Sequence, residues 1–482
     1  MTSHRISPIS ASPLLGTHSL LQCRSYVTTF LVMVLFCAVV FPFLDAEATW
    51  AASPPPCRVL SDPGTSGVQA DGFWGCLAGG EWGGHMKVRG SISRPDGESY
   101  FKPVGTGSYY DGSAEIRFKG KLYFGEWGDF VSHYEMVLSG GDTRRGVKEV
   151  EQLFPGLFPA GLSLVGPPRD RRRLMDLTST IDESDDYSFY HRLDRLYFTV
   201  MREWGALRLG RQAITWGNGL LFNPMDLFNP FSPSDIEREY KSGDDMVSLQ
   251  WSPGETVNVQ YLFVPRRDPL TGDIEWDQSS LAGKVHFARG VTECDAMVAA
   301  HYDDTIFGIG SAGYVSDAAW RCDAVYTFLD RRDTSDDYLS LVANIDYSWV
   351  WWKKNFYGYV EYYFNGLSHD RYRDANANRN MFERIDRGEL FVLGRNYVSG
   401  HIRVELHPLC NMYMTVITNL NDHSGAVQPR VVWDVATNVR LTAGGNIFYG
   451  GDDTEYGGFR IEGIDYLCAP SESAYLWLAW YF

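Results

Sequence analysis

Long stretches of the chain alternate between apolar and polar residues, so that odd and even positions form two different faces. The clearest run extends from Ala114 to Phe124, where every even position is apolar or Gly and most odd positions are charged. Successive side chains of a β-strand point to opposite sides of the sheet, so this run predicts a strand with one apolar and one charged face. The alternation recurs in residues 339–349, 356–364, 401–407, 430–435 and 438–443.

The last eight residues, 475–482, also alternate, and their even positions are all apolar. An apolar terminal strand exposes a hydrophobic face and an open edge in a soluble protein, unless it is the buried last strand of a sandwich. In an outer-membrane barrel the same face meets lipid, and the edge pairs with the first strand. The ending with Trp480 and Phe482 resembles the C-terminal signal that the barrel-assembly machinery of Gram-negative bacteria reads, although Trp477 stands where that signal commonly has Gly.

The expected strands are about ten residues long, as a tilted membrane-crossing strand requires. Short turns, at residues 203–205 and 436–437, alternate with long acidic links at 141–186, 217–244, 369–388 and 450–462. This asymmetry is typical of outer-membrane barrels. The sequence therefore predicts an all-β fold: a single-domain, transmembrane, antiparallel up-and-down β-barrel of about eighteen strands, with sixteen as the alternative.

The N-terminal region predicts export. Residues 27–44 are apolar, basic residues precede them, and the small-x-small sequence Ala46-Glu47-Ala48 follows. Together these features predict a signal peptide at residues 1–48, with an uncleaved anchor as the alternative, and they leave open whether translation starts at Met1 or Met33. Residues 49–83 are rich in Pro, Gly and Ser and predict a periplasmic lead-in or a short plug; residues 84–482 are assigned to the barrel.

Composition narrows the possible partners and cofactors. The chain has a net charge of −17, which argues against nucleic-acid binding. The Cys residues show no spacing of the CxxC kind, so we expect no metal and no cofactor. Disulfides are compatible with an exported protein, but the sequence does not define their pairing.

The most distinctive motif combines Gly210-Arg211-Gln212 with Trp216-Gly217. It resembles a segment of porin-like outer-membrane barrels, including those of the alginate-export type. The resemblance implies a channel-type outer-membrane barrel and no particular substrate. We therefore expect a channel for passive diffusion or export of small polar solutes, and the charges and tyrosines expected in the lumen favour an anionic or saccharide solute. A guanidinium that faced lipid near the membrane centre would cost about 2–4 kcal/mol, so we expect Arg211 to face the lumen.

Two groups of residues are candidates for the functional site. The expected pore-lining residues are Glu115, Arg117, Lys119, Lys121, Arg208, Arg211, Gln212, Lys284, Arg403, Glu405 and Arg440. Alternatively, these charges form structural ion pairs that fill a narrow lumen. The expected residues of a loop that constricts the pore are Asp226, Asn229, Glu237, Arg238 and Glu239, with an ordinary extracellular loop as the alternative.

Two further functions compete with a channel: a non-conducting structural or adhesive barrel, and an outer-membrane hydrolase. The sequence contains neither a G-x-S-x-G nor an H-E-x-x-H motif, so we expect no enzyme. The expected location is the outer membrane of a Gram-negative bacterium. The expected partners are its lipid and lipopolysaccharide, the barrel-assembly machinery and a small polar solute. The solute, the direction of transport and the oligomeric state remain open.

Overall fold

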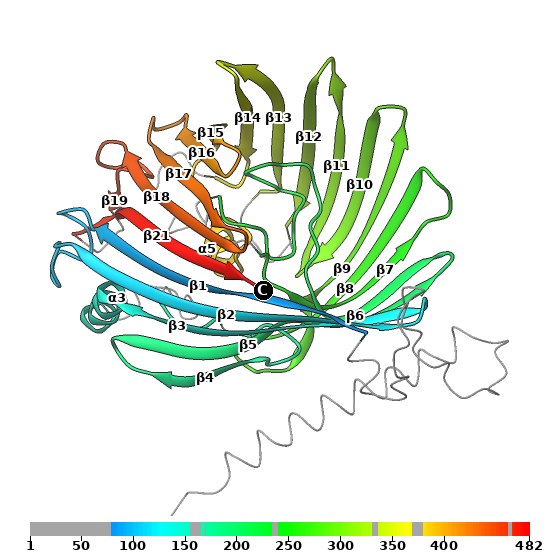
Figure 1. Ribbon diagram of the computed structural model, residues 1–482, viewed down its shortest axis with the longest axis horizontal. Helices are drawn as coiled ribbons and strands as arrows, with labels where there is room; N and C mark the ends of the chain where they lie inside the picture. The colour runs from blue at the N-terminus through cyan, green and yellow to red at the C-terminus, as the bar shows by residue number, and fades with distance from the viewer. Residues whose placement is uncertain are drawn as a thin grey trace, which may run out of the picture. The chain divides into compact units, whose positions relative to one another are not determined.

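The alternating segments of the sequence form long strands that pair with their neighbours along the chain (Figure 1). The computed structural model describes residues 79–154, 165–168, 170–233, 240–329, 336–368, 379–460 and 465–482, all within one compact unit, Cys57–Phe482. The predicted signal peptide and most of the predicted lead-in lie outside the described residues. No helix in these ranges has the length and apolar character needed to cross a membrane.

The strands of the main sheet are β1 (Glu81–Arg94), β2 (Tyr109–Phe124), β3 (Gly128–Gly141), β4 (Thr178–Glu183), β5 (Tyr187–Arg202), β6 (Gly205–Gln212), β7 (Asp244–Trp251), β8 (Val257–Arg267), β9 (Ile274–Arg289), β10 (Thr292–His301), β11 (Asp304–Val315), β12 (Ala318–Phe328), β13 (Tyr338–Trp351), β14 (Lys354–Asn365), β15 (Asn396–His407), β16 (Cys410–Asn419), β17 (Gly425–Ala436), β18 (Val439–Tyr449) and β21 (Glu472–Tyr481). The links contain α3 (Asp142–Leu153), α5 (Arg379–Asp386) and the small pair β19 (Phe459–Arg460) and β20 (Leu467–Cys468).

The sheet closes on itself between its first and last strands. β21 pairs with β1 from His85↔Tyr481 to Arg94↔Glu472, and Gly84 and Phe482 exchange backbone hydrogen bonds of 2.8 and 3.1 Å at the end of this seam. The sheet has 19 strands, of which β4 pairs only with β5, so that 18 strands form the closed antiparallel barrel. The prediction of about eighteen strands is confirmed, and the alternative of sixteen is wrong.

The two ends of the barrel differ in the length of their links. The terminal end, where β1 begins and the chain finishes, carries only short turns: 125–127, 203–204, 252–256, 290–291, 316–317, 352–353, 408–409 and 437–438. The opposite end, here called the loop end, carries the longest links: 95–108, 142–186, 213–243, 366–395 and 450–471. This is the asymmetry that the spacing of the strands predicts.

The two faces of the wall differ as the alternation predicts. On β21, Leu476, Leu478 and Trp480 are about half exposed, whereas Tyr475 and Trp477 on the other face are 5% and 4% exposed. The same division holds on β14, where Val360 is exposed and Glu361 is buried. Apolar side chains therefore cover the outer surface, and polar and aromatic side chains point inward.

One part of the wall is built differently. β6 and β7 have 8 residues each, whereas β5 and β9 have 16. Beyond the ends of the short strands, residues 170–183, here called the wall patch, complete the barrel: β4 pairs with β5, and Arg173 forms an antiparallel bridge with Arg266 of β8. The sequence predicts only a link here, because the patch makes short pairings rather than a long alternating strand.

Candidate functional site

A long link folds into the barrel between β6 and β7 (Figure 1). The structure describes residues 213–233 and 240–243 of this segment, here called the lumen loop. Gly217, with φ of 86°, and two Asn-Pro sequences keep it from continuing as a strand. Trp216, Met225 and Phe228 are buried in one cluster with inward residues of β7 to β12. Burial of these large apolar side chains holds the loop inside the wall.

The far end of the lumen loop is fixed to β14 by a single carboxylate. Glu361 accepts hydrogen bonds from the backbone N–H groups of Leu220, Leu221 and Phe222, at 2.6, 3.0 and 2.8 Å. Asn344 of β13 donates a further bond of 3.1 Å to this carboxylate. The side chain of Glu361 is 1% exposed. A backbone N–H group that lost this acceptor would remain buried without a hydrogen bond, which is unfavourable.

A second carboxylate and an aromatic stack reinforce this attachment. Asp323 of β12 accepts hydrogen bonds from the backbone N–H of Asn218, at 2.6 Å, and from its side-chain Nδ2, at 2.7 Å. The ring of Phe222 stacks on Tyr363 of β14 with 4.7 Å between centroids. We call Glu361 and Asp323 the latch carboxylates, because together they hold the lumen loop against the wall opposite β6.

The returning arm of the loop reaches the first strands. Lys241 donates a hydrogen bond of 2.5 Å to Asp226, and burial raises the pKa of the Asp226 carboxyl to about 6 despite this neighbour. Tyr240 lies over the cations of Arg117 and Lys119, 4.7 and 4.2 Å from its ring centroid, and accepts a hydrogen bond from Lys119. The loop therefore crosses from β6 to β14 and returns to β2.

The lumen wall formed by β14 to β18, β21 and β1 has a different character. Five cations there lie over aromatic rings, at 4.8–5.9 Å from the ring centroids, and we call these residues the basic lane. The pairs are Lys87 with Trp477, Arg89 with Tyr475, Arg403 with Tyr357, Arg430 with Tyr413, and Arg440 with Tyr481. All five cations are at least partly exposed. A cation over a ring is held in place while keeping its charge available to a solute.

The strand register places part of the basic lane in one row. Residues that face each other across neighbouring strands share a side of the sheet. One such row crosses five pairings and runs through Tyr475, Gly444, Arg430, Tyr413, Arg403 and Tyr357. Gly444 leaves room for the Tyr475 side chain in this row. A Cβ atom at position 444 would lie only 2.4 Å from the Tyr475 hydroxyl oxygen.

Several predicted pore-lining residues lie in ion-pair clusters instead of the basic lane. Arg117 is buried and bonds to Glu135 at 2.7 Å and Asp194 at 2.5 Å. Lys284 lies 3.4 Å from Asp295, on strands that the lumen loop covers, and 5.9 Å from the Trp216 ring. The alternative interpretation, in which charges fill the lumen as ion pairs, therefore describes this part of the interior.

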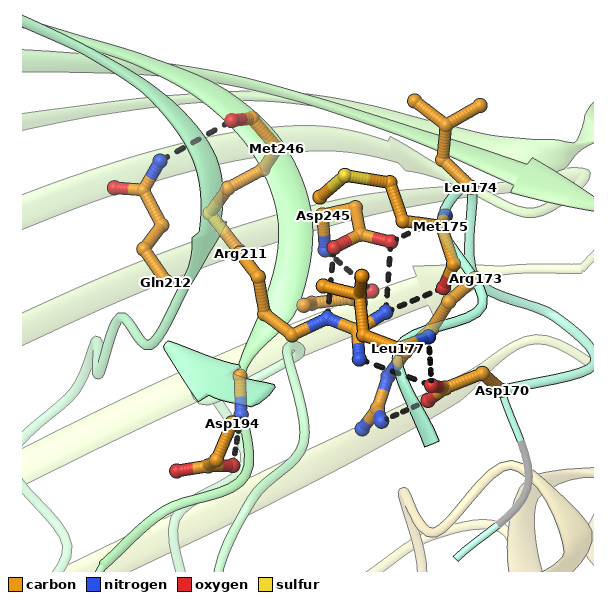
Figure 2. Close-up of polar contacts among 12 residues, drawn as sticks. Asp170, Arg173, Leu174, Met175, Leu177, Asp194, Arg211, Gln212, Asp245 and Met246 are labelled. Atoms are coloured by element: carbon orange, nitrogen blue, oxygen red, sulfur yellow. Dashed lines mark hydrogen bonds and ion pairs between the residues drawn. The ribbon is translucent and has the colours of Figure 1, made fainter. Parts of the chain in front are cut away.

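Arg211 lies in the wall rather than along the pore (Figure 2). Its guanidinium bonds to Asp245 of β7 at 2.8 Å, to Asp170 of the wall patch at 3.0 Å, and to the carbonyl oxygen of Met175 at 2.5 Å. Gln212 leaves the strand on the other side, where its amide donates to the Met246 carbonyl at 3.1 Å. The sequence predicts that Arg211 faces the lumen, whereas the structure gives its guanidinium partners in β7 and in the wall patch.

The remaining predicted residues divide between lumen and loop. Glu115 bonds to His85 at 2.8 Å, Glu405 to Asn355 at 2.9 Å, and Arg440 to Asp434 at 2.8 Å. Arg208 lies over Tyr197, and Lys121 lies over Tyr123 near the terminal end. Asn229 belongs to the described part of the lumen loop and has a positive φ of 52°. Glu237, Arg238 and Glu239 lie outside the described residues.

Sequence reasoning missed Asp323, Lys241, Lys87, Arg89 and Arg430. The alternation in β1 provides a signal for two of them, since His85, Lys87, Arg89 and Ser91 occupy successive odd positions. No comparable signal marks Asp323, because its partner Asn218 is 105 residues away in the chain.

Comparisons with known proteins give structural similarity without sequence similarity. No family model matches the chain, and no curated protein matches it. Acinetobacter baumannii OccAB2 has 10% identity and a TM-score of 0.49, over 83% of this chain and 98% of that one. The BenF-like porin of Pseudomonas fluorescens Pf-5 has 10% identity and a TM-score of 0.47, over 85% and 100%. Pseudomonas aeruginosa OpdK, solved with vanillate, has 10% identity and a TM-score of 0.45, over 83% and 98%.

The class of the protein follows from its own architecture. A closed, even-stranded antiparallel barrel with an apolar exterior, short turns at one end and long links at the other is an outer-membrane barrel. The chain is therefore an outer-membrane β-barrel.

Proposed function

We propose that the protein is a porin-like channel that lets small polar solutes, with a preference for anions, diffuse across the outer membrane. The basic lane supports this proposal most directly, because its five partly exposed cations follow the lumen wall away from the latch carboxylates; one of them, Arg440, forms an ion pair with Asp434. Cations along a narrow, low-dielectric passage raise the local concentration of anions and lower the barrier to their entry.

The choice of solute within this class rests on weaker support. The resemblance of the Gly-Arg-Gln segment to alginate-export-type barrels concerns Arg211, whose contacts hold the wall together. It therefore supports the barrel class more than a saccharide cargo or an export direction. The aromatic rings of the lane favour solutes that can stack, and its cations favour solutes that carry a carboxylate.

The proposed partners follow from the outer surface. The exposed Trp480 and Phe482 lie on the lipid side of the closing strand, where assembly machinery would meet them before the seam forms. Acidic side chains at the loop end, such as Asp185 and Asp452, are exposed and suit divalent cations that bridge lipopolysaccharide. The proposal for the first 48 residues remains a cleaved signal peptide.

A hydrolase is a weaker proposal, because its best candidate residues are enclosed. Ser280 Oγ lies 2.8 Å from His301 Nδ1, and His301 Nε2 lies 3.0 Å from Glu389. Ser280 and His301 are each 2% exposed, and Arg266 donates a hydrogen bond of 2.6 Å to the Ser280 hydroxyl. A nucleophile must reach its substrate, so this line of residues supports a structural role and a non-enzymatic protein.

Reconstitution in planar bilayers tests the channel. In asymmetric KCl solutions the reversal potential should have the sign of a chloride-preferring pore. Folding is checked independently by heat-modifiable migration in gels. Folded protein that produces no ion steps would contradict the channel and favour a structural or adhesive barrel; a potassium preference would contradict the role given to the basic lane.

A further inference from the structure

A cavity of about 310 Å³ lies at the loop end of the barrel, away from the lumen loop. Inward residues of β1, β2 and β3 form its wall, and the start of α3 and residues Val165 and Gly166 border it. α3 is held there by its buried Val147 and Val150, which pack on Phe101 and Tyr109. The volume of the cavity is at the lower end of the range for small-molecule sites, so the cavity suits a solute of about monosaccharide size.

Hydroxyl groups dominate one side of this cavity. Ser91, Ser113 and Ser139 line it from three adjacent strands, and the register places Ser113 opposite Ser139. Among the described residues, none of these three hydroxyls has a hydrogen-bond partner. Each hydroxyl can donate one bond and accept two, so the three together present donors and acceptors to a hydroxyl-bearing ligand.

Charged groups of both signs flank the hydroxyls. Arg89 reaches the cavity from the basic lane, and Arg144 is held by hydrogen bonds to the carbonyl oxygen of Ser184 at 3.0 Å and to Glu183 at 2.5 Å. Asp111 accepts bonds from the backbone N–H and the hydroxyl of Thr143, at 3.0 and 2.6 Å. Each of its carboxylate oxygens can still accept a bond from a ligand hydroxyl.

We propose that this cavity captures a polyhydroxylated monocarboxylic acid before it enters the basic lane. Arg89 would bind the carboxylate, and Arg144, Asp111 and the three serines would bind the hydroxyls. The described residues that line the cavity include no aromatic side chain, which distinguishes its chemistry from that of the lane. This inference rests on the proposed channel function and names the class of solute that the channel takes up.

Binding of gluconate to the full-length protein in detergent tests the site by titration calorimetry, without requiring conductance. Gluconate should bind at least about tenfold more tightly than sorbitol, which lacks the carboxylate, and than benzoate, which lacks the hydroxyls. Equal affinity for all three, or tighter binding of benzoate, would overturn the proposal. Binding of gluconate by protein that does not conduct would contradict the channel while leaving the site in place.

Filling the cavity provides the matched comparison. Ser139→Leu places a branched apolar side chain among the hydroxyls and should weaken gluconate binding by about tenfold or more. Ser132→Leu makes the same change on the same strand, seven positions earlier and on the outer face, opposite Gly120 of β2. It should leave the affinity for gluconate unchanged. Equal affinity for gluconate in the two variants would refute the site, provided that heat-modifiable migration in gels shows both variants to be folded.

Discussion

The two sides of the lumen contain similar charged residues but use them differently. On the side of the lumen loop, Arg117 and Lys284 face carboxylates, and Lys284 also lies near the buried Trp216 of the loop. On the side of the basic lane, Arg403 and Arg430 lie over tyrosine rings. A carboxylate neutralises a cation, whereas a ring holds it without cancelling its charge. The partner of an inward cation, rather than its inward position, therefore decides whether it can act on a solute.

The largest expected effect concerns the wall beside the lumen loop. Arg211→Ala leaves Asp245 buried without its guanidinium and leaves Asp170 with Arg173 alone, and both carboxylate side chains are at most 1% exposed. Loss of one partner of a buried ion pair costs about 3–5 kcal/mol, so the folded barrel should become much less stable. The midpoint of urea unfolding measures this change.

Arg440→Ala is the matched control, because Arg440 and Asp434 form an exposed pair in the lane that should contribute about 0–1 kcal/mol. If the two substitutions lower stability equally, Arg211 does not hold the wall together as its contacts indicate.

The next effect concerns the attachment of the lumen loop. Glu361→Ala removes the acceptor of three backbone N–H groups, each of which costs about 1–3 kcal/mol when it is left unsatisfied in a buried site. The loop should leave the wall, and the single-channel conductance should change, with larger and noisier steps than in the unmodified protein.

Glu405→Ala removes the same charge from the lumen face of the neighbouring strand, but within the described part of the chain Glu405 accepts its hydrogen bond from Asn355 and not from the loop. The conductance steps of the Glu405 variant should show no more current noise than those of the unmodified protein. Noise in both variants, or in neither, would show that Glu361 is not the latch.

A smaller effect separates the two kinds of inward cation. Arg403→Gln removes an exposed charge of the basic lane, and Lys284→Gln removes a charge that Asp295 already faces. In a watery passage one charge contributes about 0.5 kcal/mol to a nearby anion, so the chloride preference should fall about twofold in the first variant. The second variant should keep its selectivity. Reversal potentials measure both, and a larger loss in the Lys284 variant would invalidate the distinction between the two sides.

The alternation of the sequence predicts the barrel well because the face of each residue is a local property. Positions such as Val360 and Glu361 are assigned to opposite faces by counting along one strand. The attachments are not local: Leu220 finds its acceptor 141 residues later in the chain, and Arg211 finds Asp170 in a link that shows no strand pattern. Periodicity indicates that Glu361 points inward, but it contains no information about the backbone segment that reaches it.

The smallest expected effect is a pH dependence where the long links meet. Glu455 accepts hydrogen bonds from Tyr397 at 2.5 Å, Asn419 at 2.8 Å and the backbone N–H of Leu393 at 2.7 Å. Burial raises the pKa of its carboxyl from 4.5 to about 7, and the hydrogen bonds offset this only in part. The folded links therefore bind a proton that the unfolded links release.

Because the folded pKa is the higher one, the contribution of Glu455 to stability is fully present below pH 4.5 and is lost as the pH rises through 7. Glu455→Gln should remove this dependence, which is measured as the difference in melting temperature between pH 4.5 and pH 8. Asp452→Asn changes an exposed carboxylate of the same link and should keep it. A stability that rises with pH across this range in the unmodified protein, and not in the Glu455 variant, would reverse the assigned sign and place the charged form in the folded links.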